Sequence, residues 1–291
     1  GIGFLAAMFS CSMEEDIASD TKGKVDGVSE DLYAALQFNI STGTDLSTKA
    51  TTEVTGPAED SDYSEMENST EMAVNECFVF VANGDNIKVT VNGKLPENVR
   101  SKDIILRLIG DLGADGATYQ ALEFTGSTID EMSVASRMTM SNMAIEAGAK
   151  CALFTPDEKT AEYCNVELTD ELKDLKGDAD AVYAREITYN AEDLVPVLAC
   201  PSQVDNIKPV TELAGTAVDQ VFIGSCTNGR LEDLQCAAAI LKGKKVAPFV
   251  KLIVTPASRK IYKEALADGT LETLVEAGAI VTHPGCGLCC G

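Results

Sequence analysis

The sequence predicts an α/β protein built around a mostly parallel sheet, and two observations lead to this prediction. Apolar runs that read as strands alternate with amphipathic helical patterns over residues 218–282, which is the pattern typical of parallel sheets. Hydrophobic residues make up 45% of the 291-residue chain, so a sizeable core can form. Because aromatic residues make up only 5% and Trp is absent, aliphatic side chains must supply most of the packing.

The first 67 residues differ from the rest in composition. Their acidic side chains far outnumber the basic ones, and Pro, Gly, Ser, Thr and Asp are dense over residues 41–70. We therefore expect residues 1–67 to form an acidic, poorly packed segment and residues 68–291 to form the globular domain.

A short apolar run near the start ends at Cys11 and resembles the end of a bacterial lipoprotein signal, in which this thiol would carry the lipid. The other interpretation is an ordinary apolar segment with a chance cysteine. The chain up to about residue 86 also faintly resembles secreted fimbrillin-type proteins.

The first predicted strands are residues 78–82 and 87–91. Both runs are rich in β-branched residues, and residues 83–86 between them (Asn-Gly-Asp-Asn) have turn composition. This arrangement predicts a β-hairpin.

Two helices are predicted next. Ser101 caps the first, whose apolar residues repeat at helical spacing and which ends near Gly113. Thr128 and Glu131 form a capping box that opens a second helix, reaching about Ala147. Several Met residues lie in this second helix, and such a face is more often adaptable core packing than a cofactor-binding surface.

The final part of the domain alternates strands and helices. We expect strands at 220–224, 251–254 and 279–282, and helices at 231–241 and around 271–275. In a parallel sheet of this kind, binding sites form in the loops that follow the carboxyl ends of the strands.

Two of these loops contain cysteine. Cys226 follows the strand at 220–224, whereas Cys286 and Cys289 follow the last strand and form a C-x-x-C pair. The pair alone is compatible with redox chemistry, zinc or iron–sulfur. Zinc prefers a closed site of four N or S ligands, and His283 is the single histidine. Three cysteines from two loops instead suit a [4Fe–4S] cluster with one open iron, which can act as a Lewis acid.

The composition also excludes some partners. There are 46 Asp+Glu against 23 Lys+Arg, a net charge of −23, which argues against nucleic acid and against a polybasic membrane patch. No apolar run is long enough to predict a transmembrane segment.

Residues from about 87 to 291 resemble the aconitase superfamily, and within it most nearly the large subunits of 3-isopropylmalate dehydratases. Many ordered segments carry this resemblance. They are Leu95-Pro-Glu-Asn-Val, Lys102-Asp-Ile-Ile-Leu-Arg-Leu-Ile-Gly, Asp115-Gly-Ala-Thr-Tyr, Arg137-Met-Thr-Met-Ser-Asn-Met-Ala-Ile-Glu-Ala-Gly-Ala-Lys, Pro156-Asp-Glu-Lys-Thr, Val204-Asp-Asn-Ile-Lys-Pro, Phe222-Ile-Gly-Ser-Cys-Thr-Asn-Gly-Arg, Val254-Thr-Pro-Ala-Ser-Arg and Pro284-Gly-Cys-Gly.

The resemblance implies a three-layer α/β/α fold, incomplete at both ends here, and a set of site residues. Cys226, Cys286 and Cys289 match the family's [4Fe–4S] ligands, and Cys290 is a bystander. Asn142 and Glu146 match polar residues that approach the cluster and substrate, and their i,i+4 spacing places them on one helix face. The structural alternative for Glu146 is an exposed helix charge. Asn228 and Arg230 are expected to orient the first cysteine loop.

The implied chemistry is that of a hydro-lyase, which isomerises a hydroxy-dicarboxylic acid by dehydration and rehydration, as in leucine biosynthesis. The family's catalytic serine lies in a separate small subunit or swivelling domain, so the resemblance implies a heterodimer. It also implies a cytoplasmic location, where thiols stay reduced.

The resemblance fails in one informative place. The family carries active-site histidines in its N-terminal third, but residues 1–67 contain none, so we expect catalysis by this chain to be impaired. Two alternatives therefore stay open: a non-catalytic iron–sulfur relative, and an exported lipoprotein or fimbrillin-like surface protein in which the C-x-x-C pair would tend to oxidise.

Overall fold

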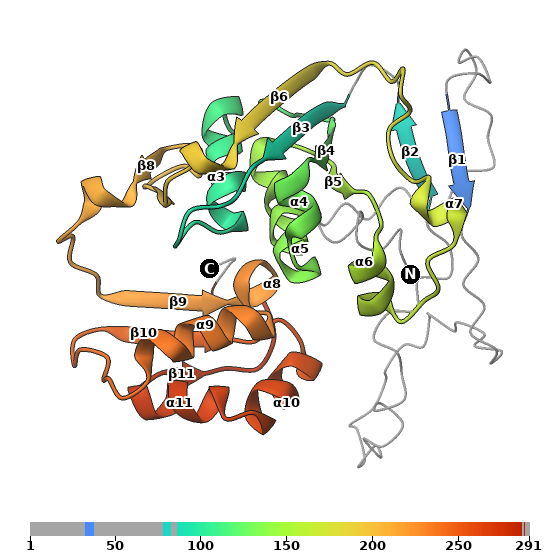
Figure 1. Ribbon diagram of the computed structural model, residues 1–291. Coiled ribbons are helices and arrows are strands. Elements are labelled where there is room, and N and C mark those ends of the chain that lie inside the picture. Colours follow the sequence, from blue (N-terminus) through green and yellow to red (C-terminus); the bar gives the residue numbers. More distant parts are fainter. Residues whose placement is uncertain (1–32, 38–77, 83–85, 287, 289–291) are drawn as a thin grey trace, which may run out of the picture.

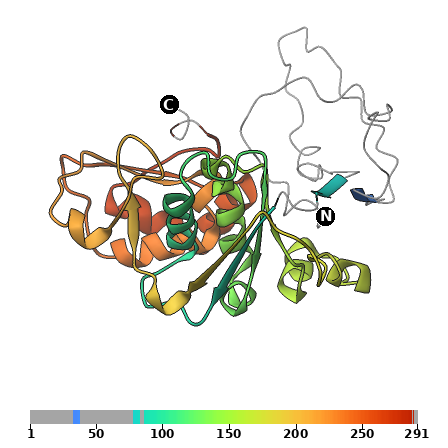
Figure 2. The same ribbon diagram turned by 90° about the horizontal axis from the view of Figure 1, so that it is seen from above.

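The computed structural model describes residues 33–37, 78–82, 86–286 and 288. Its strands form two larger sheets, each joined to helices, and two small two-stranded ones (Figures 1 and 2). Of the predicted segment 1–67 only residues 33–37 are described, and Cys11 lies outside the described residues. The strands are β1 (Tyr33–Gln37), β2 (Phe78–Ala82), β3 (Ile87–Asn92), β4 (Ala121–Thr125), β5 (Cys151–Phe154), β6 (Arg185–Asn190), β7 (Val197–Ala199), β8 (Ile207–Pro209), β9 (Gln220–Gly224), β10 (Lys251–Thr255) and β11 (Ile280–Val281).

The helices connect and flank these strands, and no described helix is long and apolar enough to cross a membrane. The α-helices are α3 (Ser101–Leu112), α4 (Ser127–Glu131), α5 (Val134–Met143), α6 (Glu158–Cys164), α7 (Asp170–Lys173), α8 (Ser225–Asn228), α9 (Leu231–Leu241), α10 (Arg259–Ala267) and α11 (Thr270–Ala277), and the 3₁₀ turns are η2 (Ala144–Ala147), η3 (Ala191–Asp193) and η4 (Val210–Leu213).

The first large sheet has the order β5-β4-β3-β6, and all its neighbouring strands are parallel. Helices α3 and α5 pack on one face and share the main core with β3 and β4. Phe124 and Phe154 stack within this core with ring centroids 5.2 Å apart. Met140 and Met143 of α5 are buried in this core, so their predicted role in core packing is confirmed.

The second large sheet has the order β11-β10-β9 and is parallel throughout. Helices α9, α10 and α11 contact one another and pack with Leu252 and Val254 of β10 in a smaller core. The predicted alternation of strands and helices is confirmed, and with it the mostly parallel α/β fold class.

The predicted hairpin is wrong. Strand β2 pairs antiparallel with β1, whereas β3 pairs in parallel with β4 and β6. The alternation of side chains along β3 therefore reflects one apolar and one polar sheet face, not pairing with β2.

The single helix expected from Thr128 to Ala147 is in fact three pieces. Helix α4 ends at Glu131, Met132 adopts an extended backbone, and the Ser133 hydroxyl caps α5 by accepting a hydrogen bond from the N–H of Ser136. The backbone then tightens into the 3₁₀ turn η2 and stops at Gly148, which is in the left-handed region.

Candidate metal centre

The carboxyl ends of the second sheet bring the two cysteine loops to one edge. Because β9, β10 and β11 are parallel, the loops after β9 and β11 leave the sheet on the same side. Gly224 pairs with Thr255 at this edge, and the hydroxyls of Thr255 and Thr282 are 2.5 Å apart. The expectation that both loops share one sheet edge is confirmed for the described residues.

The first loop is wedged tightly against β10. Gly224 has φ +137°, and a Cβ there would lie 2.0 Å from the carbonyl oxygen of Thr255. A Cβ on Gly229 would also come within 2.7 Å of that oxygen. Only glycine allows so close a backbone approach, which explains both glycines in the Gly-Ser-Cys-Thr-Asn-Gly run.

The Cys226 thiol lies in α8 and faces helix α5 of the first sheet. Its Sγ donates a 3.4 Å hydrogen bond to Oδ1 of Asn142, and the Thr227 hydroxyl donates a 2.8 Å bond to the same oxygen. Thr139, one turn earlier on α5, donates from its hydroxyl to the carbonyl of Thr227 at 2.7 Å. Two residues of α5 therefore hold the cysteine turn through its backbone and side chains.

Sequence reasoning missed Thr139 and Thr227. The signal was present, because Thr139 precedes Asn142 by three residues and so shares its helix face. Thr227 directly follows Cys226, but nothing in the sequence indicates that its hydroxyl reaches another sheet's helix.

Arg230 holds the turn from the other side. Its Nη1 donates to the carbonyls of Cys226 at 2.7 Å and Thr227 at 3.3 Å. Burial lowers the pKa of this guanidinium below its ordinary value. The expected role of Arg230 in orienting the loop agrees with these contacts.

Asn228 and Asp233 complete the turn. Nδ2 of Asn228 donates to Oδ1 of Asp233 at 2.9 Å, and the N–H of Arg230 donates to Oδ2 at 3.1 Å. Burial raises the pKa of the Asp233 carboxyl above its ordinary value, although these hydrogen bonds oppose the rise. Asn228 thus acts through Asp233, and its own Oδ1 is buried with no hydrogen-bond donor among the described residues.

The second loop is open to solvent. His283 and Cys286 are both exposed, and the His283 ring lies 6.1 Å from that of Tyr262, centroid to centroid. Cys289 lies outside the described residues. Within the described part of the chain, no three His, Cys, Asp or Glu side chains are close enough to hold a metal ion together.

Glu146 is exposed on the 3₁₀ turn η2, beyond the end of α5. The i,i+4 argument, which assumed one regular helix through both residues, therefore does not apply to Asn142 and Glu146. Of the two, the structure brings Asn142 to the cysteine turn.

The donor set of this edge fits an iron–sulfur group. Thiolate sulfur is the ligand such clusters take, and the described thiols stand on two loops of one sheet edge, with glycines that let the backbone close in. The Asn142 side chain lies directly beside the Cys226 sulfur, so it is the polar neighbour of this candidate ligand.

Most of the chain is similar in sequence to proteins of one family. A family model described as "Aconitase family (aconitate hydratase)" matches residues 69–215 and 203–291. Over 207 residues, the chain is 52% identical to the probable 3-isopropylmalate dehydratase large subunit of Methanothermobacter thermautotrophicus, covering 71% of this chain and 49% of that protein. It is 51% identical to the probable methanogen homoaconitase large subunit of Methanosarcina mazei, covering 71% of this chain and 52% of that protein.

The chain spans about half the length of these relatives. Among solved structures, the holo form of aconitase X from Thermococcus kodakaraensis matches with a TM-score of 0.41 and 15% identity, over 73% of this chain and 48% of that chain.

Proposed function

Because this chain belongs to the aconitase family, we propose that it is the cluster-binding part of a hydro-lyase large subunit that isomerises a hydroxy-dicarboxylic acid such as 3-isopropylmalate. One observation carries the proposal: Cys226 stands at the same parallel-sheet edge as the Cys286 loop and contacts Asn142. The names of the relatives, which are large subunits of dehydratases and homoaconitases, support the reaction class.

Cys226, Cys286 and Cys289 are the proposed ligands of a [4Fe–4S] cluster. When bound, such a cluster supplies an open iron that acts as a Lewis acid toward a substrate hydroxyl and carboxylate. The protein's part is positioning. Asn142 holds the face of the Cys226 turn, and Glu146 is the proposed second polar group of the site.

Asn228 and Arg230 stabilise the turn through hydrogen bonds that do not involve α5. Arg230 binds two carbonyls of the turn, and Asn228 binds Asp233 at the start of α9. A turn held on both sides places its thiol in one position, which lowers the entropy cost of ligation.

We further propose a small-subunit partner, which would supply the catalytic serine, and a cytoplasmic role in leucine biosynthesis. The relatives named as large subunits support the partner. Since His283 is the single histidine in the 291 residues, proton transfer by this chain should be impaired.

The proposal is tested by anaerobic reconstitution with ferrous iron and sulfide. Broad visible absorbance and an EPR signal after one-electron reduction are expected in the parent chain and lost in Cys226→Ala, Cys286→Ala and Cys289→Ala. Cys236→Ala is the matched control, because Cys236 is an exposed cysteine of α9 outside both loops. A parent chain that takes up no cluster would overturn the proposal.

Activity is a separate measurement. With a small subunit added, the reconstituted chain should isomerise 3-isopropylmalate far more slowly than a full-length relative does. An equal rate would show that the histidines are dispensable and that only the predicted impairment is wrong.

A further inference from the structure

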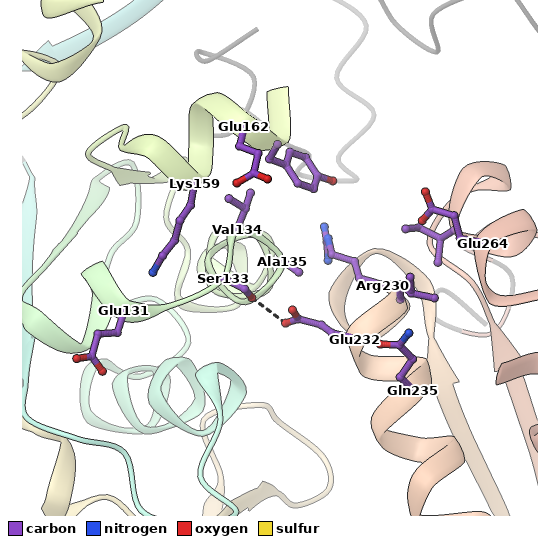
Figure 3. Close-up of a pocket in the computed structure, with 13 residues that line it drawn as sticks. Glu131, Ser133, Val134, Ala135, Lys159, Glu162, Arg230, Glu232, Gln235 and Glu264 are labelled. Atoms are coloured by element: carbon purple, nitrogen blue, oxygen red, sulfur yellow. Dashed lines mark hydrogen bonds between the residues drawn. The ribbon is translucent and has the colours of Figure 1, made fainter. Parts of the chain in front are cut away.

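A hollow of about 650 Å³ is lined in part by Arg230, the residue whose Nη1 also holds the cysteine turn. Residues of helices α5 and α6 form one wall, and residues at the starts of α9 and α10 form the other (Figure 3). Its size is that of small-molecule sites, which commonly range from about 300 to 1,000 Å³. The proposed hydro-lyase site does not use it.

The cation in this hollow is only partly engaged. Arg230 uses Nη1 to hold the carbonyls of Cys226 and Thr227, and no carboxylate of the described residues lies within ion-pair distance of its guanidinium. Within the same part of the chain, its Nε and Nη2 donate no hydrogen bond. The edge formed by these two nitrogens is the one that binds a carboxylate with two parallel hydrogen bonds.

An uncommitted anion lies nearby. The Glu162 carboxylate of α6 makes no hydrogen bond or ion pair with any described residue, and Figure 3 shows it on the wall facing Arg230. Glu232, in contrast, is engaged, because its Oε1 accepts from the hydroxyls of Ser133 at 2.9 Å and Ser136 at 3.2 Å. The hollow therefore offers one free edge of a guanidinium and two carboxylates without a partner among the described residues, Glu162 and Glu131, of which Glu162 lies on α6 across from Arg230.

The remaining surface is largely apolar. Val134 from α5, Leu231 from α9 and Ile261 from α10 all line the hollow, and Tyr163 from α6 adds an exposed ring. Aliphatic walls of this kind favour a branched aliphatic group over a polar one, because its burial releases about 25 cal/mol per Å².

We infer that this hollow binds an α-amino acid with an aliphatic side chain. Its carboxylate pairs with the Nε–Nη2 edge of Arg230, its ammonium group pairs with Glu162, and its side chain lies against the aliphatic wall. A ligand with a carboxylate alone leaves Glu162 unmatched, and a ligand with an amine alone leaves Arg230 unmatched.

The site is joined to the cysteine turn through one side chain. The same guanidinium that would bind the ligand also holds the carbonyls of Cys226 and Thr227.

Isothermal titration of the chain near neutral pH tests the inference with three probes: L-leucine, 4-methylpentanoate, which lacks the amine, and 3-methylbutylamine, which lacks the carboxylate. L-leucine should bind, and each half-ligand should bind about tenfold more weakly or worse, which corresponds to 1.4 kcal/mol per missing pair. No heat from L-leucine at millimolar concentration, or an amine that binds as tightly as L-leucine, would overturn the inference.

Variants separate the two charged contacts. Glu162→Gln should weaken L-leucine about tenfold and leave 4-methylpentanoate unchanged. Glu158→Gln, which removes the same charge one turn earlier on α6 and outside the hollow, should change neither. Equal affinity of L-leucine for the parent chain and for Glu162→Gln would contradict the assignment.

Arg230→Lys should weaken both L-leucine and 4-methylpentanoate, since an ammonium cannot replace the two-pronged edge. Should this variant fail to fold because the cysteine turn loses its support, Ile261→Ala gives the decision. It lies on α10 outside that turn and should weaken L-leucine severalfold while glycine binding stays constant. Unchanged L-leucine affinity in Ile261→Ala would overturn the inference.

Discussion

The two large sheets differ on the face turned away from their helices. In the first sheet that face is polar: Lys88 and Thr90 of β3 lie beside Glu123 of β4, and all three are partly exposed. In the second sheet, the register aligns Phe222, Ile253 and Ile280 in one apolar row. In a sheet with one solvent-exposed face, polar and apolar residues alternate along each strand. In a sheet with two apolar faces, each strand is a continuous apolar run in the sequence.

The row in the second sheet is unevenly covered. Ile253 in the central strand is 7% exposed, whereas Ile280 in the edge strand is 52% exposed. Among the described strands, the second sheet therefore carries large apolar side chains on both faces, whereas β3 and β4 of the first sheet carry them on one face.

The largest expected effect comes from exchanging these two face types. Ile253→Thr should lower the free energy of unfolding by about 3 kcal/mol, because it removes buried apolar atoms and buries a hydroxyl. Thr90→Val, the reverse exchange on the first sheet, should cost about 1 kcal/mol or less, through the lost hydroxyl contact with Thr125 at 3.2 Å. Urea unfolding measures both. Equal costs would mean that the two faces are equivalent.

This difference also explains what the sequence could predict. The continuous runs of β9 and β10 predicted the parallel sheet correctly, and the edge that carries the cysteine loops followed from it. The alternation along β3 predicts a hairpin that does not form, because a parallel strand with one polar face has the same pattern as an antiparallel strand. Only partners distant in sequence distinguish the two cases.

The break between α4 and α5 has the same kind of cause. Lys159 donates from Nζ to the carbonyls of Asp130 and Met132, and Arg137 donates from Nη2 to that of Asp130. Carbonyls bound from outside no longer need the next helical turn, so the helix can stop there. The Thr128–Glu131 pattern carries no information about Lys159.

The second prediction concerns two carboxylates with opposite pKa shifts, one in each region. Burial alone would raise the pKa of Asp157, but hydrogen bonds from Arg137 and Thr160 hold it below its ordinary value. Its contribution to stability is therefore complete above the ordinary pKa of about 3.9 and is lost as the pH falls through the lowered value. Asp157→Asn should cost about 2 kcal/mol near neutral pH, because Arg137 is left buried without its charge partner, and little in strong acid.

Asp233 should show the opposite slope. Its pKa is raised by burial, so the folded protein takes up a proton while the unfolded chain stays ionised, and acidification through the raised pKa stabilises the fold. Asp233→Asn should remove that gain. Urea unfolding across the acid range checks both variants, and slopes of the same sign would refute the contrast.

The smallest expected effect tests the contact between helix α5 of the first sheet and the cysteine turn of the second sheet. Thr227→Val removes the hydrogen bond to Asn142, and the free energy of unfolding should fall by about 1 kcal/mol. Thr216→Val, at an exposed turn position whose hydroxyl bonds no described residue, is the control and should be close to neutral. If Thr227→Val is equally neutral, the contact contributes nothing to holding the turn.

The candidate site was predictable in its chemistry and less so in its supports. The ligand set and Asn142 came from local motifs and family resemblance, which record residue types at fixed spacing. The supporting bonds from Thr139 and Thr227 join segments that are 88 and 85 residues apart, and no local pattern encodes them. The i,i+4 relation between Asn142 and Glu146 assumes a regular α-helix through both residues, whereas η2 is a 3₁₀ turn and is wound more tightly.

The glycine-rich turn around Cys226 and the loop that carries Cys286 differ in how firmly they are held and in how far they are exposed to solvent. Pressed against the Thr255 carbonyl by two glycines and tied to α5 and Arg230, that turn has no room to swing, whereas Cys286 sits on a solvent-facing stretch. Solutes that approach this edge therefore reach the exposed Cys286 thiol before the half-buried thiol of Cys226. Oxidants in solution would reach that exposed thiol first.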